Sequence, residues 1–256
     1  MPKLEIELFP CLSDNYGVLI HDPEAGVTAS IDAPDARAVL ARLEAKGWKL
    51  THLLVTHHHS DHTGGNLALK EATGCTIIGP KAEAERIPGI DVEVSEGDVV
   101  KFGDFEIKVI ETPGHTIGHV AYWIPGAKVV FVGDTLFALG AGRIFEGNAE
   151  MMWRSMQKLM RLPPDTEIYC GHEYTQGNAR FALTLEPDNP ALVNRAKEVD
   201  RLRDENKPTL PTRLDRELEC NPFLRPHVTA IRAKLGLLYA PDWQVFAAIR
   251  ERKNKS

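Results

Sequence analysis

The sequence lacks the features of membrane and exported proteins. The chain of 256 residues contains no apolar run of the roughly 20 residues that a membrane-spanning helix requires. From Met1 to Phe9 charged residues interrupt the apolar ones, whereas a secretory signal needs an unbroken apolar core, so we expect a strand there. The four cysteines form no C-x-x-C pair, which argues against a disulfide framework and predicts reduced cysteines in a cytoplasmic protein.

The chain also lacks an excess of positive charge. The chain has 30 Lys and Arg residues against 36 Asp and Glu, a formal net charge of -6, whereas nucleic-acid-binding proteins usually carry a basic excess. It contains no G-x-S-x-G motif, so the serine nucleophile of the α/β-hydrolases is not indicated. Because the net charge is negative and long apolar runs are lacking, we expect neither nucleic acid nor a membrane among its partners. With 43% hydrophobic and 26% charged residues, the composition is that of an ordinary folded protein.

Short Val- and Ile-rich runs recur through the first two thirds of the chain and predict strands. After Tyr174 no strand is expected, and long segments have apolar residues at helical spacing. The helices predicted from spacing and end signals are 34–47, 65–73, 149–162, 189–206 and 241–253. This organisation predicts a mixed α/β domain over residues 1–173 and a smaller helical domain over residues 174–256.

A dense group of metal-binding side chains follows the apolar strand that ends at Val55. Its motif is H-x-H-x-D-H, formed by His57, His59, Asp61 and His62. Imidazole nitrogens and carboxylate oxygens suit zinc, iron or manganese. The alternative is a polar turn whose histidines cap the next helix, but this motif is improbable by chance directly after a strand.

Three further candidates lie at similar strand ends, and a glycine precedes each of them. They are His115, Asp134 and His172. Glycine permits the sharp turn that exposes the next side chain. Each alone would be an ordinary turn residue, but together the four strand ends offer five histidines and two aspartates, enough for two metal ions.

This pattern resembles the metallo-β-lactamase superfamily and, more closely, the hydroxyacylglutathione hydrolases, also called glyoxalase II. The matching blocks beyond the metal motif are TPGHT at 112–116, GRIFEG at 142–147, CGHEYT at 170–175 and NPFLR at 221–225. With the order of elements around them, these blocks extend the resemblance over nearly the whole chain. It implies a metallo-β-lactamase-like αββα sandwich followed by a smaller all-helical C-terminal domain.

The resemblance also implies two divalent metal ions, with zinc predicted and iron or manganese as alternatives. The implied ligands are His57, His59 and His115 for the first ion, Asp61, His62 and His172 for the second, and Asp134 as the bridge. A hydroxide shared by the metals is the expected nucleophile, so Asp61 and Asp134 are the predicted catalytic carboxylates, and Asp61 could also move a proton. His58 is expected to support its neighbours without binding metal. Asp32 could support a ligand or cap the next helix.

The basic C-terminus is the candidate for substrate binding. Arg250 and Lys253 share a helix face and could hold one carboxylate, although such tails are more often solvated. The resemblance favours binding, because the family places an R-x-x-K pair on the glycine carboxylate of glutathione. Arg143 and Tyr174 match further glutathione contacts. Phe145 stands where some members have Tyr, so that hydroxyl is lost, and we assign it no role.

The expected activity is hydrolysis of S-(2-hydroxyacyl)glutathione, chiefly S-lactoylglutathione, to glutathione and D-lactate, which would detoxify methylglyoxal. The protein is expected to act as a monomer on this small-molecule thioester. One alternative is an iron-dependent dioxygenase of glutathione persulfide that binds a single iron. Others are a lactonase, a β-lactamase, or a non-catalytic metal-dependent scaffold.

Overall fold

The computed structural model describes residues 3–256, which form two compact units. The first comprises the chain up to Glu111 together with Ile117–Gly133, and the second comprises Thr112–Thr116 and Asp134–Ser256. The domain boundary predicted at residue 173 stays a prediction. Within residues 3–256, every helix is too short or too polar to cross a membrane.

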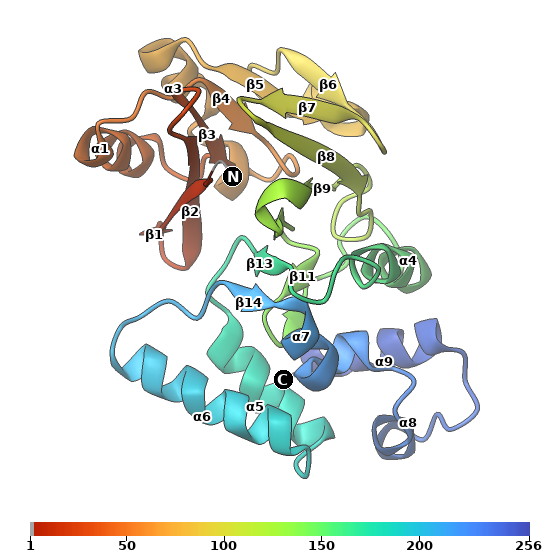
Figure 1. Cartoon of the computed structure of the whole chain (residues 1–256). Coiled ribbons are helices and arrows are strands. Elements are labelled where there is room, and N and C mark those ends of the chain that lie inside the picture. Colours follow the sequence, from red (N-terminus) through yellow and green to blue (C-terminus); the bar gives the residue numbers. More distant parts are fainter. Residues whose placement is uncertain (1–2) are drawn as a thin grey trace. The chain divides into compact units, whose positions relative to one another are not determined.

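The first unit is built on a sheet of six strands in sequential order (Figure 1). The strands are β1 (Glu5–Cys11), β2 (Asn15–Asp22), β3 (Val27–Ile31), β4 (His52–Leu54), β5 (Thr76–Pro80) and β6 (Val92–Val94). The first three pair antiparallel, and β3 to β6 pair parallel. Because parallel strands end at one edge of a sheet, the residues that follow β3 and β4 lie close together.

Helices fill the connections between these parallel strands. They are α1 (Ala36–Lys46), α2 (Ser60–Thr63), α3 (Asn66–Thr73) and the 3₁₀ turn η1 (Lys81–Arg86). The side chain of Asp35 caps α1 by accepting from the Arg37 backbone N–H, and Gly47 ends it in the left-handed conformation at φ 68°. Val39 of α1 and Leu69 of α3 join the buried apolar cluster that covers one face of the sheet.

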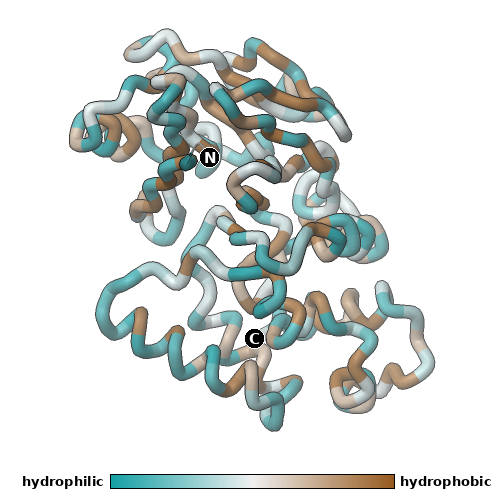
Figure 2. Tube along the Cα trace, viewed as in Figure 1, coloured by the Kyte–Doolittle hydropathy of each residue, from teal (hydrophilic) through white to brown (hydrophobic). Residues whose placement is uncertain are grey.

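An antiparallel meander within the same unit contacts the first sheet. Its strands are β7 (Val99–Phe102), β8 (Phe105–Glu111), β9 (Val120–Ile124) and β10 (Val129–Phe131), with the 3₁₀ turn η2 (Pro125–Ala127). Tyr122 of β9 is fully buried, and its hydroxyl donates to the Val55 carbonyl oxygen at 2.7 Å. Strands β9 and β10 are almost wholly buried, and their sequences are continuously apolar. Figure 2 shows apolar segments among the strands of this unit. The predicted strands are confirmed.

The second unit is mainly helical. Its elements are β11 (Leu136–Phe137), β12 (Gly140–Ala141), α4 (Ala149–Leu159), β13 (Glu167–Tyr169), α5 (Thr175–Leu185), α6 (Pro190–Asp204), β14 (Thr212–Arg213), α7 (Leu214–Cys220), η3 (Pro222–Leu224), α8 (Thr229–Leu235) and α9 (Asp242–Asn254). Helix α6 is hydrophilic along most of its length (Figure 2), and its buried Leu192 and Ala196 join Ala179 and Ala182 of α5 in one core. The aromatic rings of Trp153 and Phe246 join α4 to α9 at 5.9 Å.

The predicted helices are confirmed, although α4 ends three residues before its expected end at Leu162. The expectation of no strand after Tyr174 is wrong, because β14 pairs with β13 and places Thr212 opposite Ile168. A two-residue strand is too short to show the alternating pattern on which such a prediction depends.

Candidate metal centre

The loop after β4 holds the first two histidines of the motif in a defined orientation. Thr56 donates from its backbone N–H and its hydroxyl to the two carboxylate oxygens of Asp32, at 2.7 and 2.8 Å. His57 is fully buried, and its Nδ1 lies 3.0 Å from the Thr56 hydroxyl. The Nε2 atom of His57 and the Nδ1 atom of His59 lie 3.1 Å apart, so two candidate ligand atoms face the same point.

Asp32 also orients His62. The Nδ1 atom of His62 lies 2.8 Å from Asp32 Oδ2, and an ionised carboxylate only accepts, so Nδ1 donates. The unprotonated Nε2 atom is then left for a metal, which is the usual role of such a carboxylate. The alternative that Asp32 caps the next helix is wrong, because Asp35 provides that cap.

Asn15 contacts the candidate ligand Asp61, which no sequence pattern indicated. It is buried at the start of β2, and its side-chain amide donates to Asp61 Oδ2 at 3.1 Å and to the Asp61 carbonyl oxygen at 3.2 Å. The Asp61 carboxylate is partly exposed, so this amide restricts a side chain that would otherwise rotate. An asparagine in a hairpin is normally explained by the turn, and nothing in the local sequence connects it with Asp61.

The two other histidines near the motif do not join these candidate ligands. His58 is turned toward Glu83, whose carboxylate lies 2.7 Å from its Nδ1. His119 is fully buried, and its ring stacks on that of His57 with centroids 4.9 Å apart. His58 thus hydrogen-bonds to Glu83, and His119 packs on His57; that they support the candidate ligands stays a prediction.

The second unit brings together His115, Asp134 and His172. His115 Nδ1 donates to the Arg143 carbonyl oxygen at 2.8 Å, which leaves its Nε2 available for a metal. The Oδ2 atom of Asp134 lies 3.5 Å from His115 Nε2 and 3.3 Å from His172 Nε2. One carboxylate oxygen thus lies within reach of two imidazoles, as a bridging ligand would.

The turn before His115 needs glycine for two reasons. Gly114 has φ 146°, and a Cβ atom there would lie 2.5 Å from the side chain of Met152. No L side chain fits both the backbone conformation and this close approach. The sequence signal of a glycine before the ligand therefore has a steric cause at this position.

Cys170 lies two residues before His172 but is not suited to be a nucleophile. It is only 3% exposed, and burial raises the pKa of its thiol to about 12. At neutral pH the thiol is protonated, and the thiolate is the reactive form. The site chemistry therefore rests on the histidines and aspartates.

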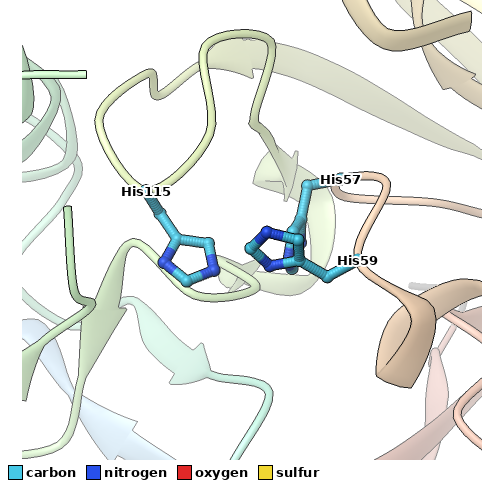
Figure 3. Close-up of side chains that lie close together, drawn as sticks. All are labelled: His57, His59 and His115. Carbon is cyan, nitrogen blue, oxygen red and sulfur yellow. The ribbon is translucent and has the colours of Figure 1, made fainter. Parts of the chain in front are cut away.

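Three groups of the predicted ligands have all their donor atoms within 4.8 Å of one another. The groups are His57, His59 and His115; His57, His62 and Asp134; and Asp61, His62 and His172. Figure 3 shows the first group, with the imidazole rings turned toward one another. Nitrogen and carboxylate donors at this spacing fit divalent transition metals, and they do not select among zinc, iron and manganese.

Three cations of the second unit lie near one another. Arg250 is buried and donates from Nη1 to the Ala141 carbonyl oxygen at 2.7 Å, and Lys253 donates to the Gly177 carbonyl oxygen at 3.1 Å. Burial is the main cause that lowers the pKa of Arg250 to about 10, and the nearby charge of Arg143 adds to it. Burial is also the main cause that lowers the pKa of Lys253, followed by the charges of Arg250 and Arg143. With a pKa of about 10, Arg250 keeps its charge at neutral pH. Among residues 3–256, no carboxylate forms an ion pair with any of them.

Two aromatic side chains lie against the candidate ligands in this unit. The ring of Tyr174 stacks on that of His172 with centroids 4.7 Å apart and planes 4° apart. Phe145 is 62% exposed and meets the His115 ring edge-on at 5.2 Å. Tyr174, a predicted substrate contact, thus lies beside one candidate metal ligand, and Phe145, which had no predicted role, lies beside another.

Two family models together match most of the chain. Residues 23–172 match the model of the metallo-β-lactamase superfamily, and residues 173–256 match that of the hydroxyacylglutathione hydrolase C-terminus. The hydroxyacylglutathione hydrolase of Brucella ovis is 60% identical over 252 residues, which are 98% of each chain.

Solved structures show the same fold. The crystal structure of ETHE1 from Myxococcus xanthus superimposes with a TM-score of 0.67 at 26% identity, covering 97% of this chain and 98% of its own. TTHA1623, solved in a di-iron-bound form, superimposes with a TM-score of 0.54 at 26% identity, covering 67% of this chain and 91% of its own. The predicted fold class is confirmed. The chain belongs to the hydroxyacylglutathione hydrolase family within the metallo-β-lactamase superfamily.

Proposed function

We propose that this protein hydrolyses the thioester of S-(2-hydroxyacyl)glutathione, chiefly S-lactoylglutathione, to glutathione and D-lactate. The observation that carries the proposal is the clustering of histidine and aspartate donor atoms within 4.8 Å in a chain of this family. Hydrolysis of the lactoyl thioester would complete the detoxification of methylglyoxal.

The seven predicted ligands suit two divalent metal ions. We assign His57, His59 and His115 to one ion, Asp61, His62 and His172 to the other, and Asp134 to both, with zinc as the predicted metal and iron or manganese as alternatives. The crystal structure of TTHA1623 in a di-iron-bound form supports two ions in this fold. When bound, such ions lower the pKa of water and polarise a carbonyl. Asp32 and the Arg143 carbonyl hold two of the imidazoles with Nε2 unprotonated.

A thioester matches a site with these side chains. A thiol has a pKa near 8.5, so the thiolate leaves without first receiving a proton, whereas an amine would need an acid. The Asp61 carboxylate is partly exposed and hydrogen-bonded to Asn15, so it can accept a proton from water and return it to solvent. No protein nucleophile is required, in agreement with the high pKa of Cys170.

The three clustered cations would bind the carboxylates of glutathione. Arg143, Arg250 and Lys253 have no acidic partner among residues 3–256, so an anionic ligand would relieve their mutual repulsion. We assign Tyr174 to the same substrate because its partly exposed ring lies on His172. Phe145 offers only apolar contact at its position.

Lys253→Ala is expected to raise KM for S-lactoylglutathione about fivefold and to leave kcat nearly unchanged. A half-exposed charged contact contributes about 1 kcal/mol after solvent screening, which corresponds to that change. Steady-state kinetics measure it, with Lys255→Ala as the matched control because Lys255 pairs with Glu251 on the same helix end. Unchanged KM, or a fall in kcat alone, would remove Lys253 from the substrate site. Arg250 is a poorer test, because it also packs on Phe223.

The proposed function is tested by a hydrolysis assay on S-lactoylglutathione, run beside metal analysis of the same sample. We expect release of glutathione and D-lactate with two ions per chain. Oxygen uptake and sulfite formation from glutathione persulfide, with one iron per chain, would instead establish the dioxygenase alternative. We also propose that the protein is cytoplasmic, since all four cysteines are free and buried, and that it acts as a monomer.

A further inference from the structure

Glu83 lies outside the predicted ligand set, yet its carboxylate is almost completely buried beside the metal-binding loop. It belongs to η1, which follows β5, and its side chain is 2% exposed. Three N–H groups converge on it. The backbone and ring N–H groups of His58 donate to Oε2 at 2.7 Å each, and the backbone N–H of Gly118 donates to Oε1 at 2.9 Å.

The proton positions in this network follow from its partners. The Nη2 atom of Arg86 is hydrogen-bonded to His58 Nε2. Because a guanidinium only donates, Nε2 is the acceptor. The ring proton of His58 is therefore on Nδ1 and is donated to Glu83. The ring of His58 is thus directed at Glu83 and Arg86, although its two sequence neighbours are predicted ligands.

The backbone contacts connect two different segments. His58 lies between His57 and His59, and Gly118 lies three residues after His115. The approach is close at Gly118, where a Cβ atom would lie 2.6 Å from Glu83 Cγ. The buried carboxylate of Glu83 thus accepts hydrogen bonds from His58, the middle residue of the loop 57–59, and from Gly118 in the segment that precedes β9.

We infer that Glu83 is a positioning residue for the metal centre: by holding the backbone and ring of His58 on one side, it turns His57 and His59 toward the metal on the other. This inference rests on the proposed function, since it assigns a role at the same centre. A buried acceptor of three donors is costly to replace, because any donor that loses its partner stays desolvated. Outer contacts of this kind typically change metal affinity about 10- to 100-fold.

Glu83→Gln tests the inference with minimal change in shape. In either orientation its side-chain amide would present N–H groups to His58 or to Gly118, so at least one of the three donors loses its acceptor. We expect zinc affinity at one of the two sites to fall about 10- to 100-fold, while the other ion is retained. Metal-free protein is titrated with zinc against a chromophoric chelator, and the cobalt-substituted protein should show an altered absorption spectrum. Glu85→Gln, an exposed change in the same turn, is the matched control and should behave as wild type.

Each result is decisive. Two ions bound by Glu83→Gln as tightly as by wild type, even with a lower Tm, would show a purely structural role and overturn the inference. A third ion that is lost in the variant would make Glu83 a ligand and also overturn it. If wild type binds no metal, the proposed function fails instead. Should Glu83→Gln not fold, Gly118→Ala keeps every carboxylate while displacing Glu83, and the same loss of affinity is expected.

Discussion

Replacing Asp134 with asparagine is expected to lower kcat/KM for S-lactoylglutathione by at least about 10³-fold while the protein remains folded. Its Oδ2 atom lies within 3.5 Å of His115 Nε2 and within 3.3 Å of His172 Nε2, where a bridging carboxylate would lie. Asparagine keeps the size but removes the negative charge that two cations would share. Since metal ions provide several kcal/mol of charge stabilisation and each 1.36 kcal/mol changes the rate tenfold, the loss should reach that size.

The measurement combines steady-state kinetics with circular dichroism, thermal unfolding and metal content. Asp188→Asn is the matched control, because it removes an exposed carboxylate from the same unit. We expect the control to keep wild-type kinetics, and Asp134→Asn to lose metal as well as activity. Near-normal turnover by folded Asp134→Asn would refute the assignment of Asp134 as the bridge.

Removal of the metal ions by a strong chelator is expected to abolish turnover by a comparable factor, and addition of zinc should restore it. The described side chains offer no activated serine, and the Cys170 thiol is protonated at neutral pH, so we expect no metal-independent route to hydrolysis. Metal that binds only the folded state also stabilises it, by about 2.7 kcal/mol when free metal is 100 times Kd. The Tm should therefore fall on chelation and recover with zinc.

Two controls separate metal loss from damage. Chelator that has been saturated with zinc beforehand should leave the enzyme active. Metal-free protein should retain its circular dichroism spectrum, because the apolar clusters of the two units include none of the candidate ligands. Full activity in protein shown by analysis to be metal-free would contradict the proposed chemistry.

Local patterns determined much of the fold. Helix α1 could be located from its apolar spacing and from Gly47, because the left-handed end of a helix favours glycine wherever it occurs. The H-x-H-x-D-H motif was equally plain, since its donors are neighbours that follow one buried strand. These features depend on residues within a few positions of one another, which is the range over which a sequence pattern reports structure.

Only the tertiary structure decided which side chains support the candidate ligands. Asp32 meets Thr56 across 24 residues, Glu83 meets His58 across 25, and Asn15 meets Asp61 across 46. The burial of Arg250 against Ala141, 109 residues away, was likewise absent from a pattern that indicated an exposed basic tail. Hydrogen bonds between distant segments depend on how sheets and loops pack. The identity of a carboxylate or amide residue does not reveal whether its side chain lies in solvent or under a metal-binding loop. The sequence by itself therefore determined the ligand types and the strands that present them, and the packing of distant segments determined how each ligand is held.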